Sequence, residues 1–176
     1  HRGVLTGGAI TDMRLTLTAG RAHEKHTEGG DFRQATYRAV RQGLRKAKSI
    51  LLEPWYSLRL ELPQASLGRA LADIQRMGGE TEPPVTVGEE VVLTGGGPVS
   101  QLRDYAGEVA AYTKGRGRLT LLPGPYRPCP EQEALVAQRA YDPDGDAENP
   151  TGSIFCAHGA GYYVPWDQVE EHMHLS

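Results

Sequence analysis

The sequence predicts an α+β fold in which a split βαβ domain follows a smaller, partial α/β domain. Between residues 55 and 122 the apolar pattern gives the order strand, helix, strand, strand, helix, strand. The residues before it contain one alternating segment and one amphipathic helix, and after Pro123 the composition changes to proline, glycine and acidic residues. We therefore expect three parts, at residues 1–51, 52–124 and 125–176.

The first part begins with a predicted strand and a polar loop. In residues 10–18 polar and apolar residues alternate, with Met13, Leu15 and Leu17 on one face, which is typical of a half-buried strand. A polar loop follows. Asp31 is then placed to cap a helix by accepting hydrogen bonds from its first free amides.

The predicted helix runs to about Lys48 and has two contrasting faces. Apolar side chains recur at helical spacing and form a stripe for burial: Phe32, Ala35, Ala39, Val40 and Leu44. Four basic side chains gather opposite them, within about a quarter of the circumference at ~100° per residue: Arg38, Arg41, Arg45 and Lys48. No acidic residue lies between Phe32 and Lys48, so this cluster is either a solvated face or a surface that contacts phosphates.

The second part combines four strands with two helices. Alternating residues predict strands at residues 56–62, 85–87, 91–93 and 119–122, and helical spacing predicts helices at residues 67–77 and from Val99 to near Gly115. This succession predicts a ferredoxin-like domain, an antiparallel four-stranded sheet with both helices on one face. Many unrelated functions share that scaffold, so it specifies none by itself.

The third part is an acidic extension that we expect to end in ordered structure. Residues 142–150 are rich in proline, glycine and aspartate and predict an exposed loop. Ile154 to Leu175 should fold back onto the body, because four aromatic residues in this stretch are too apolar for a solvated end: Phe155, Tyr162, Tyr163 and Trp166. Asp167 is placed to cap a short terminal helix.

Charge is distributed unevenly along the chain. The net charge is −3, but residues 1–50 carry 10 Lys and Arg against 4 Asp and Glu, whereas residues 131–176 carry 1 basic and 9 acidic residues. The first part therefore suits a polyanionic partner, and the end of the chain repels one. No apolar run reaches the ~18 residues of a membrane span and no signal peptide is recognisable, so we expect a cytoplasmic protein without a membrane partner.

The sequence contains no convincing catalytic or metal-binding motif. The phosphate loop Gly-x-x-x-x-Gly-Lys-Ser/Thr of a GTPase is absent, and no serine or cysteine lies in a nucleophile motif. Asp142, Asp144 and Asp146 match alternate ligands of a calcium loop, but Ala147 and Ser153 stand where that loop requires glycine and glutamate. His-x-x-His in the polar loop lacks the helical spacing of a zinc enzyme, and a site at Cys156 and His158, with His172 and His174, would rest on a weak pattern. We expect no catalytic residue, metal or cofactor in these residues.

The order of elements, with two short motifs, resembles the fourth and fifth domains (domains IV and V) of elongation factor G. The motifs are Leu51-Leu-Glu-Pro54 before the split βαβ unit and Thr113-Lys-Gly-Arg-Gly117 before its last strand. The resemblance covers about residues 4–122 and implies part of domain IV at residues 1–51 and domain V at residues 52–124. Four further features look more like the tetracycline-resistance ribosomal protection proteins: Asp31-Phe32, Gly124-Pro-Tyr126, Cys129 and Asp167-x-Val169.

The resemblance implies that a loop at the tip of domain IV enters the decoding centre of the small ribosomal subunit. The tip-loop residues would be Arg21, Ala22, His23, Glu24, Lys25, His26 and Thr27. In the resistance proteins this loop displaces the drug. Those proteins typically carry Ser-Pro-Val in the tip, where Glu24-Lys25-His26 stands in this chain, and His23-Glu24 looks more like the elongation factor.

The expected partners are therefore the ribosome and its small-subunit rRNA. We expect the protein to be a monomer and not to bind DNA. Phosphate contacts would supply affinity, and His23 and His26 could stack on an unpaired base. GTP and Mg²⁺ are expected in a GTPase domain elsewhere in the parent protein, of which this chain would be a non-catalytic fragment. The alternatives are elongation-factor translocation, another ribosome-associated role, and a free-standing RNA-binding module, whose sheet would normally display paired aromatics that this sequence lacks.

Overall fold

The computed structural model describes residues 1–23 and 27–174, which form two compact units. Unit 1 consists of His1–Leu51 together with Glu131–Ser176, and unit 2 of Leu52–Pro130. The C-terminal extension is thus not a third part: from residue 131 on it belongs with the first part of the chain. In the described residues no helix is long and apolar enough to cross a membrane.

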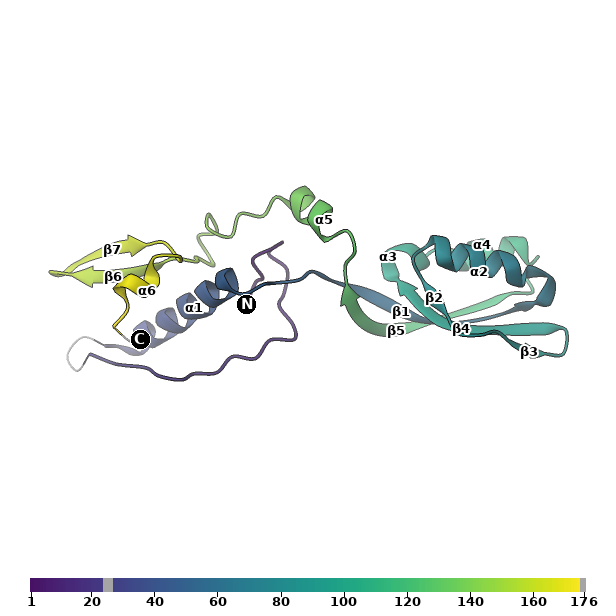
Figure 1. The fold of residues 1–176 in the computed structure, drawn as a ribbon, viewed down its shortest axis with the longest axis horizontal. Helices are drawn as coiled ribbons and strands as arrows, with labels where there is room; N and C mark the ends of the chain where they lie inside the picture. The colour runs from purple at the N-terminus through teal and green to yellow at the C-terminus, as the bar shows by residue number, and fades with distance from the viewer. Residues whose placement is uncertain (24–26, 175–176) are drawn as a thin grey trace. The chain divides into compact units, whose positions relative to one another are not determined.

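Unit 2 is an antiparallel sheet with helices on one face, which confirms the predicted α+β fold (Figure 1). Its strands are β1 (Leu52–Pro63), β2 (Glu80–Thr81), β3 (Val85–Val87), β4 (Glu90–Pro98) and β5 (Arg118–Pro128). The strand order is β2-β4-β1-β5, and β3 forms a ribbon with the first half of β4. The short helices are η1 (Gln64–Ser66) and α3 (Val99–Leu102), and the longer ones are α2 (Leu67–Arg76) and α4 (Tyr105–Tyr112).

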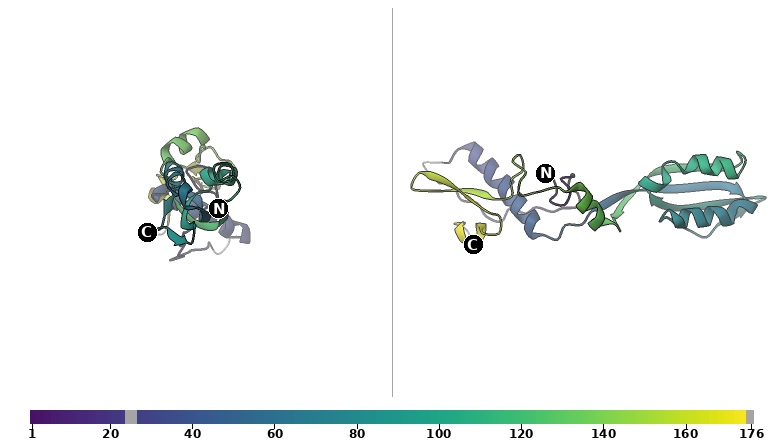
Figure 2. Two further views of the ribbon diagram at one scale, coloured as in Figure 1. Left: turned by 90° about the vertical axis from the view of Figure 1, so that its right-hand side faces the viewer. Right: turned by 90° about the horizontal axis from the view of Figure 1, so that it is seen from above.

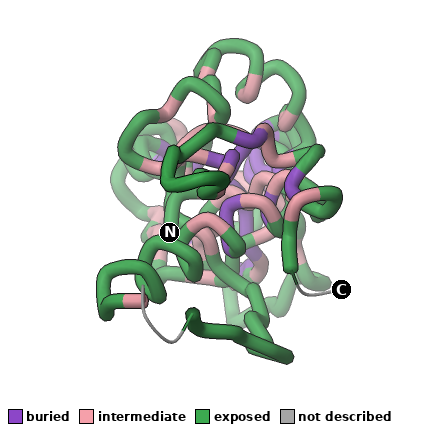
Figure 3. The backbone as a smooth tube through the Cα atoms, turned by 90° about the vertical axis from the view of Figure 1, so that its left-hand side faces the viewer, coloured by how far each residue is buried: buried purple, intermediate pink, exposed green. Residues whose placement is uncertain are grey.

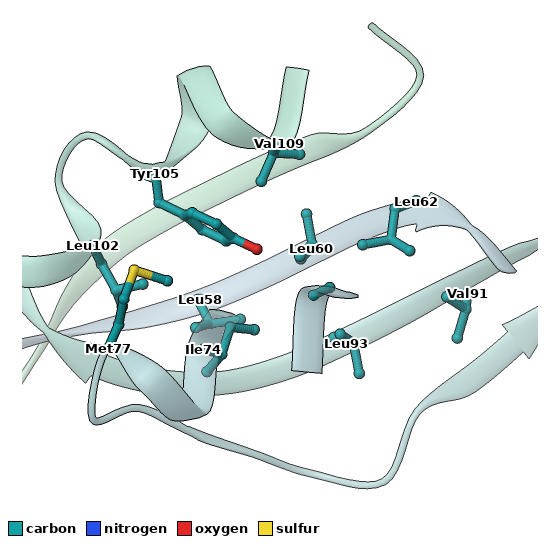
Figure 4. Packing of buried hydrophobic residues seen from close by; sticks show 11 residues of the cluster. Leu58, Leu60, Leu62, Ile74, Met77, Val91, Leu93, Leu102, Tyr105 and Val109 are labelled. Atoms are coloured by element: carbon teal, nitrogen blue, oxygen red, sulfur yellow. The ribbon is translucent and has the colours of Figure 1, made fainter. Parts of the chain in front are cut away.

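The core of unit 2 forms where α2 and α4 meet the same side of β1 and β4 (Figure 4). Because side chains alternate along a strand, β1 turns Leu58, Leu60 and Leu62 toward the helices and leaves Arg59 on the opposite, exposed face. Burying each leucine contributes about 1.5–3 kcal/mol. The period-two pattern read from the sequence therefore identifies the core face correctly.

A buried tyrosine joins the two helices of unit 2. The hydroxyl of Tyr105 donates to Asp73 Oδ2 at 3.3 Å and lies 3.0 Å from the hydroxyl of Tyr112. Tyr105 is 1% exposed, and burial, followed by the hydrogen bond to Tyr112, raises its pKa well above the usual value. The phenol therefore stays protonated in the folded unit.

The glycines at the end of β4 are required by packing. A Cβ on Gly97 would lie 2.7 Å from Leu102 Cδ1, and one on Gly96 would lie 2.9 Å from the carbonyl oxygen of Tyr56. These contacts are closer than real Cβ atoms make, so only glycine lets α3 and β1 approach β4 this closely. The three consecutive glycines are thus explained by the close approach of neighbouring segments to β4.

The helix of unit 1, α1 (Gly29–Lys46), begins earlier and ends earlier than predicted. Its N-cap is Glu28, and Asp31 is the third helical residue, where its Oδ2 accepts from the Glu28 N–H at 2.9 Å. Lys48 lies beyond the C-cap residue Ala47. The predicted stripe is buried only at Val40 and Leu44, which pack with Val4, while Phe32 is 54% exposed.

The prediction of a half-buried strand at residues 10–18 is wrong. No strand includes these residues, and residues 11–20 are all exposed, Leu17 by 90%. Alternation makes one face apolar, but a strand also needs a hydrogen-bonded neighbour, and in the described residues the only pairing nearby is an isolated bridge between Arg2 and Ala9. The segment is therefore extended without being part of a sheet.

The extension folds back onto α1, as predicted from its aromatic content. It contains α5 (Gln132–Arg139), the hairpin of β6 (Ser153–Ala157) and β7 (Ala160–Val164), and the short α6 (Val169–His172). Val164 and Val169 are 2% and 6% exposed, and the Gln42 side chain of α1 donates to the Trp166 carbonyl at 3.3 Å. The expectation for Leu175 lies outside the described residues.

Candidate nucleic-acid interface

The chain before the predicted tip loop is exposed, and the loop is closed at its base. Residues 11–23 are all exposed, as the green tube of Figure 3 shows for most of the surface of this unit, and Thr27 is half-buried. The backbone N–H of His23 donates to Thr27 Oγ1 at 2.7 Å, which brings the two described ends of the predicted tip loop together. Arg21 and Ala22 are exposed. Glu24, Lys25 and His26 lie outside the described residues.

The helix end behind this loop is fixed by its capping box. The Glu28 side chain accepts from the backbone of Asp31, and the Asp31 side chain accepts from the backbone of Glu28. This reciprocal pair satisfies two amides that the first turn would leave without partners. The place where the loop joins α1 is therefore held by hydrogen bonds of residues 23, 27, 28 and 31.

Arg41, predicted to lie on an exposed basic face, is instead 2% exposed. Its guanidinium donates from Nη1 to the Arg2 carbonyl at 2.6 Å and from Nε to the Asn149 carbonyl at 2.8 Å. Nη2 lies 3.2 Å from the Tyr141 hydroxyl and 3.5 Å from the Pro143 carbonyl. A planar guanidinium can serve several acceptors at once, so Arg41 ties the N-terminal segment and the extension to α1.

Two further basic residues of α1 also bond to the extension. Arg38 Nη1 donates to the Gly152 carbonyl at 2.8 Å. Arg45 Nη2 pairs with Asp144 Oδ2 at 2.9 Å, and its guanidinium lies 4.9 Å from the centre of the Trp166 ring. The expectation of an unpaired basic cluster fails because the acidic extension supplies acceptors that are distant in sequence. Among the four predicted residues only Lys48 is exposed and lacks a side-chain partner.

The loop that receives these arginines is organised by its own acidic side chains. Asp146 accepts from the Tyr141 hydroxyl at 2.7 Å and from the backbone N–H groups of Glu148 and Asn149, each at 3.0 Å. The hydrogen bond from Tyr141, which is the largest effect, lowers the pKa of Asp146, while burial raises the pKa of Tyr141. The carboxylates of this loop therefore serve internal hydrogen bonds.

Three exposed arginines of unit 1 lie in the segments that lead into and out of the tip loop. Arg14, Arg21 and Arg33 are exposed, and the described structure gives their side chains no hydrogen bond or ion pair. Arg14 and Arg33 are not among the contact residues predicted from the sequence, although Arg14 belongs to the polar face of the predicted strand. Free guanidinium groups of this kind suit phosphate oxygens, because they can donate two parallel hydrogen bonds.

Within the described ranges, no group of three or more His, Cys, Asp or Glu side chains could hold a metal ion. The candidate residues of the tail have other surroundings. The His172 ring packs 5.9 Å from the rings of both Phe155 and Tyr162, and Cys156 is exposed on β6. The arrangement around the tip loop thus offers cationic and hydrogen-bonding groups rather than a reaction centre.

Comparisons with known proteins divide the chain near residue 50, close to the first boundary between the two units. Residues 1–48 match the family "Elongation factor G, domain IV", and residues 50–136 match "Elongation factor G C-terminus". The tetracycline resistance protein TetP of Clostridium perfringens is 34% identical over 113 residues, which is 64% of this chain and 17% of that protein. Elongation factor G 2 of Streptomyces coelicolor is 34% identical over 128 residues, covering 73% of this chain and 19% of the relative.

Two more relatives agree with these matches. Elongation factor G 1 of Synechocystis sp. is 31% identical over 133 residues, which is 76% of this chain and 19% of that protein. A protein of Thermus thermophilus, known from a crystal structure, superposes on 55% of this chain and 15% of its own length with a TM-score of 0.53 and 28% identity. The chain spans less than a fifth of the length of each curated relative described above.

Proposed function

Because the chain carries the domain IV and the C-terminal domain of the elongation factor G family, we propose that it is the ribosome-docking part of a translational GTPase. The GTPase domain, with its GTP and Mg²⁺, would lie in another part of the parent protein. Both family matches are to C-terminal domains, and the sequence contains no phosphate loop. The chain's own contribution is then binding and positioning.

The observation that carries the proposal is the exposed basic approach to the tip loop. Arg14 and Arg21 before the tip loop and Arg33 after it present guanidinium groups without a side-chain partner, and His23 and Thr27 close the base of the loop. Such groups gain affinity for rRNA by releasing the counterions of its phosphates. The buried Arg41 bonds α1 to the N-terminal segment and to the extension, so the tip loop is joined to a helix that is held in place.

The tip loop is the element that acts once the protein is docked. We assign residues 21–27 to the decoding centre of the small subunit, where they displace tetracycline from its site. The similarity to TetP supports this choice, since TetP is a tetracycline resistance protein. Elongation-factor translocation is the second candidate, favoured by the equal identity of 34% to elongation factor G 2.

Docking is tested by measuring binding to purified small ribosomal subunits over a range of salt concentrations. Replacing Arg14, Arg21 and Arg33 together with Ala should weaken binding and reduce the slope of log affinity against log salt by about one for each phosphate that is no longer neutralised. Lys46→Ala is the matched control, because Lys46 is a basic residue of the same unit that is already paired with Glu170. Equal slopes for the triple variant and the wild type would disprove the docking role of the approach.

The action of the tip loop needs a separate assay. Replacing residues 23–26 with Gly and Ser in the parent protein should leave most of the ribosome affinity intact, because the body still docks. Translation by purified ribosomes in the presence of tetracycline then distinguishes the candidates. Loss of protection supports drug displacement, loss of translocation supports the elongation-factor role, and no change in either activity rejects the tip loop as the active element.

A further inference from the structure

The β6–β7 hairpin of unit 1 presents an apolar face that is half exposed, and within the described residues Tyr163 of this face is in contact with Gly152. Ile154 pairs with Tyr163 and Cys156 with Gly161, so these residues share one face. Ile154 is 59% and Tyr163 53% exposed. Large exposed apolar side chains that lie together indicate a contact surface more often than chance.

The opposite face of the hairpin is already occupied. Phe155 pairs with Tyr162, and the His172 ring of α6 lies 5.9 Å from the ring of each. The hairpin therefore has one face packed against its own chain and one face turned outward. The outward face makes little contribution to packing within the described chain.

The hairpin is anchored at its base and free at its turn. Gly152 accepts from Arg38 of α1, the Tyr163 ring lies against Gly152, and Val164 is 2% exposed. The turn residues His158 and Gly159 have φ values of 53° and 80°, the left-handed pair that suits a two-residue hairpin. Since an isolated hairpin is marginally stable, this anchoring is what presents the outward face in one conformation.

The hairpin lies at the same end of unit 1 as the start of α1, and its turn points the same way as that helix end in both side views (Figures 1 and 2). The start of α1 is where the tip loop joins, with Arg21 and Arg33 on either side of it. A polyanion bound to these arginines would therefore extend next to the hairpin. Residues 151–166 contain no Asp, Glu, Lys or Arg, so no carboxylate on the hairpin repels such a partner.

We propose that the outward face of the β6–β7 hairpin is a second RNA-contacting element, on which unpaired rRNA bases stack beside the site of the tip loop. A tyrosine ring with a neighbouring isoleucine offers a flat, uncharged surface, and base stacking on aromatic side chains is the common way in which proteins bind single-stranded RNA. This inference rests on the proposed ribosome docking, and it adds a contact that needs neither phosphate nor the tip loop.

The test places a photo-crosslinking amino acid at position 163 and measures what it reaches on the small ribosomal subunit. Crosslinks to rRNA are expected. A second measurement compares the affinity of Ile154→Ser/Tyr163→Ser with the wild type, where loss of a stacked base should weaken binding roughly five- to a hundredfold without changing the salt slope. Tyr126→Ser, which removes a tyrosine that is 62% exposed in unit 2, is the matched control.

Each outcome has a distinct meaning. Crosslinks to a ribosomal protein, or an affinity within twofold of the wild type in the double variant, would overturn the RNA-contacting role while leaving docking intact. A wild-type chain that fails to bind small subunits would overturn the proposed function together with this inference. Hydrogen exchange of the double variant should retain wild-type protection of α1, and reduced protection with weakened binding would instead assign Ile154 and Tyr163 to folding.

Discussion

Replacing Arg41 with Met should unfold unit 1 more readily than any surface substitution on α1. Arg41 is 2% exposed and makes two short hydrogen bonds, 2.6 Å to the Arg2 carbonyl and 2.8 Å to the Asn149 carbonyl. A hydrogen bond to a charged group contributes about 1.5–3 kcal/mol, and removing the donor leaves both buried acceptors without a partner. Met retains much of the volume of the side chain, so we expect a loss of about 3–5 kcal/mol in the free energy of unfolding.

The assay uses the two tryptophans, one in each unit. In a Trp55→Phe background the remaining Trp166 reports on unit 1, where it lies beside the Arg45 guanidinium. Urea unfolding followed by Trp166 fluorescence gives the free energy of unfolding for Arg41→Met. Arg33→Met is the control, because Arg33 is an exposed arginine of the same helix without a side-chain partner.

The reasoning would be refuted if Arg41→Met and Arg33→Met had the same stability within about 0.5 kcal/mol. That result would mean that the buried guanidinium gains no more from its carbonyl partners than it loses by leaving water. Hydrogen exchange provides a second check, since the amides of α1 should lose protection in Arg41→Met while those of β1 keep theirs. Equal loss in both units would also contradict the assignment of Arg41 to unit 1 alone.

Three further predictions concern the extension and unit 2. Deleting residues 131–176 should abolish the hydrogen-exchange protection of α1, because its buried arginine loses most of its acceptors, and unchanged protection would count against docking of the extension. Gly97→Ala should lower the stability of unit 2 by about 1–3 kcal/mol, because the new Cβ meets a leucine methyl at 2.7 Å. Gly107→Ala, in open space on α4, should raise the stability by roughly 0.5–1 kcal/mol. Calorimetry that gave both changes the same sign would be inconsistent with this packing. The raised pKa of Tyr105 means that the folded unit holds a proton that the unfolded chain releases near pH 10, so the associated stability is complete below about pH 10 and falls above it. Tyr105→Phe should flatten that decline in unfolding experiments at high pH, Tyr126→Phe should not, and identical pH profiles would argue against the buried phenol.

The sequence by itself was sufficient for the fold of unit 2. Leu58, Leu60 and Leu62 alternate with polar residues, and a strand repeats every two residues, so the buried face can be read without knowing its neighbours. The split βαβ succession follows because helix and strand periods differ. The predicted return of the extension to the body also holds, since aromatic burial is favourable wherever a surface is available.

The alternating pattern gave a wrong strand prediction at residues 10–18 because a strand forms only when it pairs with a second strand. Alternation states which side chains would face a core, but hydrogen bonds from a second strand decide whether the sheet exists. Leu17, which the pattern assigns to a buried face, is 90% exposed. The start of α1 also differs from the prediction. Asp31 is the third helical residue and not the N-cap, because it forms a capping box with Glu28, which is the N-cap.

Tertiary structure decides which basic residues of the candidate interface are bonded within the fold and which are exposed, and no local sequence pattern contains that information. The sequence indicated a basic helix and an acidic extension and predicted that the former suits a polyanionic partner. It could not show that the anionic and carbonyl oxygens for Arg41 and Arg45 come from the chain itself, at positions 2, 144 and 149. Burial of a guanidinium depends on acceptors that approach from distant segments, whereas helical periodicity describes only neighbours along one element. That Arg33 stays free on α1 while Arg38, Arg41 and Arg45 bond to other segments is therefore known only once the extension has taken its place against the helix.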